Sequence, residues 1–173
     1  PKKDIESLSD ENVAKRVAGE KTYLPATARA VLTLFDFYQI EIEGLNIAMI
    51  GNSDIVGKPI ALMCLERKAT VTACDEFTED IPSITKAADI IIVAIGKPKF
   101  IDESYIRHDN SQVIIDIGIN DIGIDEATGK RKICGDTDFE NIKDKVLAIT
   151  PVPGGVGPLT VLSLIENLMD SVV

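Results

Sequence analysis

The sequence predicts an α/β fold: a Rossmann-like, doubly wound, mainly parallel sheet with helices on both faces. Short and almost wholly apolar runs recur along the chain, as in parallel strands that are buried on both sides. Stretches with helical spacing of apolar residues separate these runs, which is the pattern of βαβ units. A glycine-containing turn, Gly51–Pro59, lies between the first apolar run and a helical stretch. Such a turn is typical of nucleotide-binding sheets.

The expected elements follow in chain order. Residues 1–24 are polar and mixed, with one short helix near 10–18, and a second helix begins at Pro25 and ends before Gly44. Strands are expected at 45–50, 69–74, 89–95, 112–117 and 146–149, and short helices at 59–66 and 81–87. The polar stretch Asn120–Lys132 is expected to be a surface hairpin. A terminal helix closes the chain, with one apolar side: Leu162, Ile165, Met169 and Val172.

Composition excludes several classes of function. The 173 residues fit one domain with a proper core, and the net charge of −10 argues against a nucleic-acid partner. No apolar run is long enough to span a membrane, so we expect no membrane partner. Cys64, Cys74 and Cys134 form no CxxC pair, and His108 is the single histidine. We therefore expect no metal site, reduced cysteines and a cytoplasmic protein.

The turn Gly51–Pro59 predicts a dinucleotide site, although Ser53 stands where the fingerprint GxGxxG has its second glycine. Asp75 ends the second strand, where dinucleotide folds bind the adenosine ribose hydroxyls. Asp75 and Glu76 would repel a 2′-phosphate, and the turn offers Asn52 rather than a cation. The sequence thus favours NAD over NADP as cofactor.

The segment Thr150–Thr160 is rich in proline and glycine and can be neither a strand nor a helix interior. It follows the last expected strand and precedes the terminal helix. A rigid, glycine-lined turn at this end of a strand is where open α/β sheets bind ligands. The alternative is a stiff structural connector.

These two segments together resemble the methylenetetrahydrofolate dehydrogenase/methenyltetrahydrofolate cyclohydrolase family over essentially the whole chain. The resemblance implies two lobes: an N-terminal catalytic lobe with a Tyr-x-x-x-Lys motif and a C-terminal cofactor lobe. This chain matches the second. Residues 1–24 are expected to be the segment that crosses from the N-terminal lobe, and residues 25–173 the NAD(P)-binding Rossmann domain. Because no Tyr-x-x-x-Lys occurs here, no catalytic residue is expected in this chain.

The resemblance also implies the binding residues. Cofactor-binding positions are Gly51, Asn52, Ser53, Ile55, Asp75, Gly96, Ile119 and Thr160; substrate-binding positions are Glu6, Pro151, Gly154 and Gly155. Several residues depart from the family pattern. Asn52 replaces a common arginine, Asp75-Glu76 replaces His-Ser, and Glu6-Ser7 replaces Asp-Gly. Residues 25–30 replace Pro-Cys-Thr-Pro-x-Gly.

The implied activity is oxidation of 5,10-methylenetetrahydrofolate by hydride transfer to NAD(P), followed by hydrolysis to 10-formyltetrahydrofolate. Implied partners are tetrahydrofolate derivatives, the protein's own N-terminal lobe and a second copy in a homodimer. We expect this chain alone to bind cofactor with negligible turnover. Two alternatives are a stand-alone, non-catalytic nucleotide-binding module or degenerate relative, and a different Rossmann dehydrogenase. A different Rossmann dehydrogenase would need a catalytic Lys–Asp pair or a histidine pair, and we identify no residues in this sequence for that role.

Overall fold

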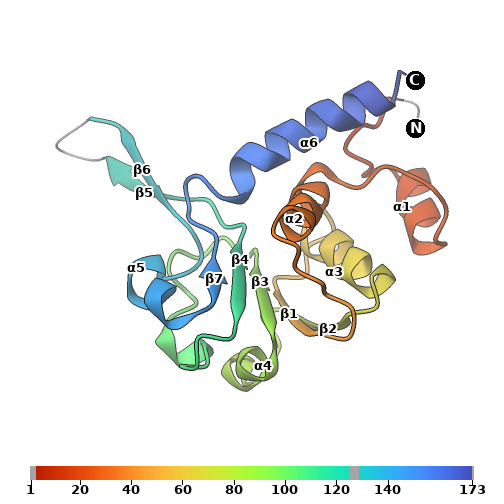
Figure 1. Ribbon diagram of the computed structural model, residues 1–173. Coiled ribbons are helices and arrows are strands. Elements are labelled where there is room, and N and C mark those ends of the chain that lie inside the picture. The colour runs from red at the N-terminus through yellow and green to blue at the C-terminus, as the bar shows by residue number, and fades with distance from the viewer. Residues whose placement is uncertain (1–2, 125–128, 173) are drawn as a thin grey trace.

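The computed structural model, which describes residues 3–124 and 129–172, is built on a five-stranded parallel sheet of order β2-β1-β3-β4-β7 (Figure 1). The strands, listed in chain order, are β1 (Asn46–Ile50), β2 (Thr70–Cys74), β3 (Ile90–Val93), β4 (Val113–Asp116) and β7 (Ala148–Ile149). The predicted doubly wound α/β class is confirmed. Each strand begins or ends within a few residues of its predicted bounds.

Helices cover both faces of this sheet. One face carries α2 (Ala26–Phe37), α3 (Gly57–Glu66) and the start of α6 (Val156–Asp170), which share an apolar cluster with Met49, Ile90 and Ile92. The other face carries α4 (Ile81–Ala87), α5 (Phe139–Ile142) and the short 3₁₀ helices Glu103–Tyr105 and Lys143–Lys145. Ile91 and Val93 point into this second cluster. Because successive strand residues alternate between faces, β3 is buried on both sides.

The strand order reverses beside β1. From β1 the chain passes through α3 to β2 on one side, and then returns through α4 to β3 on the other side of β1. The loops that follow β1 and β3 therefore diverge above the carboxyl ends of these strands. In open α/β sheets this divergence creates the ligand crevice.

The segments on either side of α1 (Asp10–Val17) are hydrogen-bonded to the end of α6. Asn167 donates hydrogen bonds to the carbonyl oxygens of Ile5 and Leu24, each 2.8 Å long. Arg16, which is 4% exposed, donates to the Ser7 carbonyl at 3.1 Å. The segment that precedes α1 and the end of α6 lie side by side as a result (Figure 1).

Asp4 organises the turn that leads into α1. Its carboxylate accepts hydrogen bonds from the backbone N–H groups of Leu8 and Ser9 and from the Asn12 amide. Burial acts to raise the pKa of Asp4, but these hydrogen bonds outweigh burial and hold the pKa well below its ordinary value. The ionised carboxylate therefore stabilises this turn.

Helix α6 has its polar side buried and its apolar side exposed. Ser163 and Asn167 face α2, where Arg29 also forms ion pairs with Glu166 and Asp170. The predicted apolar side exists but faces solvent: its residues are at least 47% exposed, namely Val161, Leu162, Ile165, Leu168, Met169 and Val172. A single domain does not normally place a helix in this orientation.

The predicted hairpin is present as β5 (Asn120–Ile124) and β6 (Arg131–Cys134), an antiparallel pair that projects from the carboxyl edge of the sheet (Figure 1). Within the described residues, no helix combines the length and the apolar character that a membrane crossing requires.

Ser7 is expected to carry backbone strain that glycine would relieve. Its φ is +57°, in the left-handed region, and its side chain is fully buried. Ser7→Gly should raise the free energy of unfolding by about 1 kcal/mol in urea denaturation. The control is Gly19→Ala, at φ +71°, where an added Cβ would meet open space. This variant should lower the free energy of unfolding. Destabilisation by Ser7→Gly would mean that the Ser7 hydroxyl contacts outweigh the strain.

The inverted polarity of α6 predicts opposite sensitivities on its two sides. Ile165→Gln should change the free energy of unfolding of this chain by less than about 0.5 kcal/mol, because Ile165 is already exposed. Asn167→Ala should lower it by about 2–3 kcal/mol, because the carbonyls of Ile5 and Leu24 lose their donor. Chemical denaturation of both variants tests this, and equal losses would contradict it.

Candidate functional site

A cleft of about 540 Å³ opens above the carboxyl ends of β1, β2 and β3. Three loops line it. The loop after β1 contributes Gly51, Asn52 and Ser53, and the loop after β2 contributes Asp75. The remaining lining residues come from these strands, from the loops after β2 and β3 and from the first residue of α4: Ile50, Cys74, Glu76, Phe77, Ile81, Ala94, Ile95, Lys97 and Phe100. The structure thus brings four of the predicted cofactor-binding residues into one cleft.

Two glycines allow the loops to approach each other closely. Gly51 has φ +101°, and a Cβ there would lie 2.2 Å from the Ala94 carbonyl oxygen. A Cβ on Gly57 would lie 1.9 Å from the Gly51 carbonyl oxygen. Helix α3 can therefore begin directly against the end of β1. These are the tight-turn and helix-packing roles of the first and third glycines in dinucleotide folds.

The Ser53 hydroxyl binds the backbone at the start of α3. It accepts from the N–H groups of Val56 at 3.3 Å and Gly57 at 3.4 Å. Within the described residues, the N–H groups of Ser53, Asp54 and Ile55 have no acceptor. These three residues lie in the loop that precedes α3, and unpaired N–H groups of successive loop residues can hold an anion. The Ile55 side chain does not line the cleft and is mostly exposed.

Asp75 keeps one carboxylate oxygen available. Its Oδ1 accepts from the Phe77 N–H at 3.0 Å and from the Thr78 hydroxyl at 3.2 Å, whereas its Oδ2 has no partner among the described residues. Lys97 is the cation that lines this cleft, and its Nζ lies 5.7 Å from the Phe100 ring centroid. Lys58 points elsewhere, because it pairs with Asp54 at 2.5 Å.

Gly96 and Ile119 lie on the loops after β3 and β4. Gly96 has φ +65°, and Ile119 is exposed at the base of the β5–β6 hairpin. Both loops are tied to a buried carboxylate, Asp136, which accepts from the N–H groups of Ile95 at 2.7 Å and Gly96 at 3.0 Å. Sequence reasoning did not find this role of Asp136, because its partners lie some forty positions away in the chain.

Asp116 lies at the end of β4 and is also buried. It accepts from the N–H groups of Gly118 and Asp136, each at 3.0 Å, and from both the N–H and the hydroxyl of Thr137. Burial raises the pKa of Asp116 above its ordinary value, although these hydrogen bonds act in the opposite direction. Thr150, which begins the proline–glycine segment, accepts from the Asp116 N–H at 2.8 Å.

The proline–glycine segment borders a different hollow. Its residues from Val156 onward belong to α6, so the expectation that the whole segment precedes the terminal helix is wrong; Pro158 is tolerated because it lies in the first turn. Pro151, Gly154 and Gly155 line a mainly apolar cavity of about 800 Å³ between the end of α2 and strands β4 and β7. The Val152–Pro153 peptide bond is cis, and Gly154 has φ +109°. The Thr160 hydroxyl donates to the Val156 carbonyl within α6 at 3.2 Å, so its hydrogen-bonding donor is already used.

Glu6 is separated from this segment. Its neighbour Ile5 is bonded to Asn167, and Gly155 precedes α6 at the other end. At 1.5 Å of rise per residue, these two ends of α6 lie roughly 18 Å apart. The predicted substrate-binding residues thus form two groups, which one ligand could contact only if it lay along α6.

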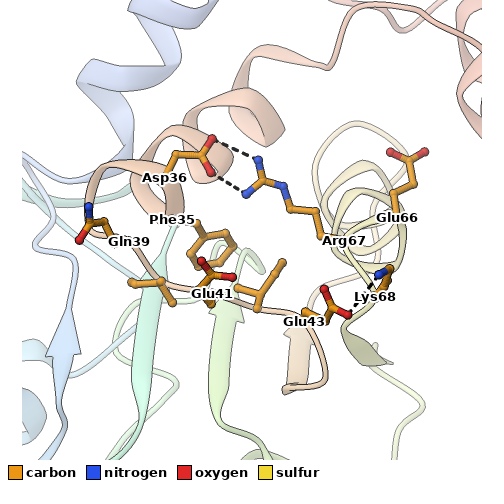
Figure 2. A pocket seen from close by; sticks show the side chains of 10 residues that line it. Phe35, Asp36, Gln39, Glu41, Glu43, Glu66, Arg67 and Lys68 are labelled. Atoms are coloured by element: carbon orange, nitrogen blue, oxygen red, sulfur yellow. Dashed lines mark hydrogen bonds and ion pairs between the residues drawn. The ribbon is translucent and has the colours of Figure 1, made fainter.

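A further hollow lies at the opposite, amino edge of the sheet (Figure 2). Arg67 there pairs in a bidentate manner with Asp36, at 2.6 and 3.1 Å, and Lys68 pairs with Glu43 at 3.1 Å. These ion pairs join α2 and the segment after it to the segment that follows α3. Because each charge has a partner of opposite sign, we assign no ligand to them. In the part of the chain that the structure describes, no cluster of His, Cys, Asp and Glu could hold a metal ion.

Comparison with known proteins supplies the family. The family model of the tetrahydrofolate dehydrogenase/cyclohydrolase NAD(P)-binding domain matches residues 25–173. The chain is 43% identical to the bifunctional protein FolD of Agathobacter rectalis and 45% identical to that of Dictyoglomus turgidum, each over 171 residues. These matches cover 99% of this chain but 58% of each relative, so the chain spans little more than half of their length.

Solved structures agree with these relatives. A bifunctional FolD methylenetetrahydrofolate dehydrogenase/cyclohydrolase from Campylobacter jejuni superposes with a TM-score of 0.89 at 39% identity, covering 98% of this chain and 57% of that one. The Trypanosoma brucei enzyme, solved with NADP and an inhibitor, gives 0.90 at 32% identity over 99% and 58%. The chain therefore belongs to the tetrahydrofolate dehydrogenase/cyclohydrolase family, which it matches through the NAD(P)-binding domain.

Proposed function

We propose that this chain is the cofactor-binding part of an enzyme that oxidises 5,10-methylenetetrahydrofolate to 5,10-methenyltetrahydrofolate and hydrolyses the product to 10-formyltetrahydrofolate. The observation that carries the proposal is the cleft at the strand-order reversal, where Gly51, Ser53 and Asp75 meet. Residues 25–173 would form the NAD(P)-binding domain and residues 1–24 the crossing segment. We place the protein in the cytoplasm.

The geometry of the cleft fits a dinucleotide. Free N–H groups at Ser53–Ile55, in the loop before α3, would hold the pyrophosphate, with Asn52 beside them. The Asp75 Oδ2 atom would accept hydrogen bonds from the adenosine ribose. The nicotinamide half would extend toward Gly96, Ile119 and, at the start of α6, Thr160. When bound, the nicotinamide accepts the hydride, and the protein supplies position and electrostatics.

We favour NAD over NADP. Asp75 and Glu76 lie together where a 2′-phosphate would be placed, and two carboxylates repel a group that carries nearly two charges. Lys58, which could have compensated, is paired with Asp54. Lys97 also lines this cleft, but it comes from the loop after β3, whereas Asp75 and Glu76 come from the loop after β2. We therefore do not assign Lys97 to the 2′-phosphate position. The Trypanosoma brucei relative was solved with NADP, so this preference would separate the two proteins.

The folate substrate would meet the proline–glycine segment at Pro151, Gly154 and Gly155, with Glu6 toward the other end of α6. The acid–base lysine is expected in an N-terminal lobe, because no Tyr-x-x-x-Lys motif occurs in this chain. The exposed apolar side of α6 is the surface that we assign to that lobe.

A homodimer is part of the proposal. Exposed Phe37 and Tyr38, beside the apolar hollow, suit a second copy.

A second candidate is a non-catalytic nucleotide-binding module or degenerate relative. The departures at Asn52, Asp75 and Glu76, together with the lack of the lysine motif, favour it. The complete proline–glycine segment favours the enzyme, because a module that only binds a nucleotide has no use for a wall between cofactor and folate.

Cofactor choice is tested by isothermal titration of this chain with NAD and NADP. We expect NAD to bind at least about tenfold more tightly, since one unfavourable charge contact of about 1.4 kcal/mol suffices. Asp75→Asn should weaken NAD binding and narrow the difference. Glu79→Gln, an equal charge change at a nearby exposed residue, should leave both affinities unchanged. Tighter binding of NADP would show that the carboxylate argument is wrong.

Turnover is tested on the same chain. With 5,10-methylenetetrahydrofolate and NAD, we expect cofactor binding but no measurable absorbance change from NADH formation, because this chain contains no candidate for the acid–base lysine. A preparation that reduces NAD would overturn the assignment of catalysis to another lobe. A chain that binds neither dinucleotide would overturn the cofactor proposal itself.

A further inference from the structure

We propose that Asp136, held in place by Asp116, is a positioning residue that sets the backbone of the loops lining the cofactor cleft. This inference rests on the proposed function, because it assigns to these loops a role in binding NAD. The two carboxylates are fully or almost fully buried, at 0% and 1% exposure. Neither has a basic side chain as a hydrogen-bond or ion-pair partner among the described residues.

Asp136 joins two loops that the sheet itself does not connect at this edge. Its Oδ2 accepts from the backbone N–H groups of Ile95 and Gly96, just beyond β3. Its Oδ1 accepts from the Asn120 side-chain amide at 2.8 Å, just beyond β4. Strand pairing between β3 and β4 ends at Val93 and Asp116, so these contacts replace the ladder where it stops.

Asp116 fixes the position of Asp136. It accepts the Asp136 N–H and both donors of Thr137, so the segment after β6 cannot shift without breaking several hydrogen bonds. Glycines admit the two carboxylates: a Cβ on Gly118 would lie 2.2 Å from the Asp136 carboxyl, and a Cβ on Gly135 would lie 2.0 Å from that of Asp116. The positions of both carboxylates are therefore closely defined.

The same network reaches both proposed ligand surfaces. Ile95 lines the proposed cofactor cleft, and a Cβ added to Gly51 would meet the backbone of Ala94 and the side chain of Ile95, so the two loops are in direct contact. At the other end, Asp116 donates its N–H to Thr150, the first residue of the proline–glycine segment. A shift of Asp136 would therefore change the distance between the first glycine loop and the loop that faces it.

The chain offers a matched control at the opposite edge of the sheet. Gln112 is fully buried, and its side chain donates to the carbonyls of Thr85 and Ala88 and accepts from the Arg107 N–H. It precedes β4, whereas Asp116 ends that strand. Loss of either network should destabilise the fold, but only loss of the Asp136 network should alter the cofactor cleft.

The experiment uses this 173-residue chain with Asp136→Ala, Asp136→Asn and Gln112→Ala. Amide hydrogen exchange is measured by NMR without ligand, and the NAD affinity by calorimetry. Asp136→Ala should speed exchange at Ile95 and Gly96 and weaken NAD at least about tenfold, because two buried donors lose their acceptor. Asp136→Asn should stay within about threefold, since its amide oxygen still accepts both N–H groups and only the acceptor for the Asn120 amide is lost. Gln112→Ala should leave the affinity unchanged.

If Asp136→Ala does not fold, Asn120→Ala removes one contact to the same carboxylate and should weaken NAD by about threefold. Unchanged affinity in a folded Asp136→Ala or Asn120→Ala variant would overturn the proposal, as would equal weakening by Gln112→Ala. If the unmodified chain binds no NAD, the proposed function fails. The exchange rates at Ile95 and Gly96 then still decide whether Asp136 holds the loop.

Discussion

Two buried carboxylates, Asp116 and Asp136, are the constraint on which the candidate site depends. Among residues 3–124 and 129–172 they accept from four and three donors respectively, and each of these donors is a backbone N–H, a hydroxyl or a side-chain amide rather than a basic group. Burial of a charge is costly unless hydrogen bonds satisfy it, so this arrangement tolerates little displacement. A parallel sheet leaves the backbone beyond its strands unpaired. Here the two carboxylates take up those groups and join the loops above β3 and β4.

The other organising interaction is polar contact between α6 and the N-terminal segment. Asn167 and Arg29 hold α6 against α2 and residues 5–24, so the polar side of the helix is used within this chain. Its apolar side is left exposed. An exposed apolar side of this kind is the surface on which we propose that another lobe packs.

The order of elements was predictable from the sequence because it depends on local patterns. The runs at 89–95 and 112–117 are apolar without alternation, which is what strands covered on both faces require. The close approach of the loop after β1 to its neighbours was predictable for a related reason: Gly51 and Gly57 flank a strand–helix junction, and their spacing is short and local. Asp75 followed from its place at the end of the next strand. The orientation of α6 was not predictable. Its periodicity shows that the helix has an apolar side, but not whether that side packs against this domain or faces solvent.

By itself, the sequence determined the fold class, the order of strands and helices, and the glycine-containing loop after β1, because spacing and glycine chemistry act over a few residues. Tertiary structure decided that Asp136 reaches Ile95 and that Glu6 lies at the far end of α6 from Gly155. It also decided that the proline–glycine segment borders its own hollow rather than the cleft beside Gly51. These relations join residues from distant parts of the chain, and the packing of the sheet, not local pattern, brings them together.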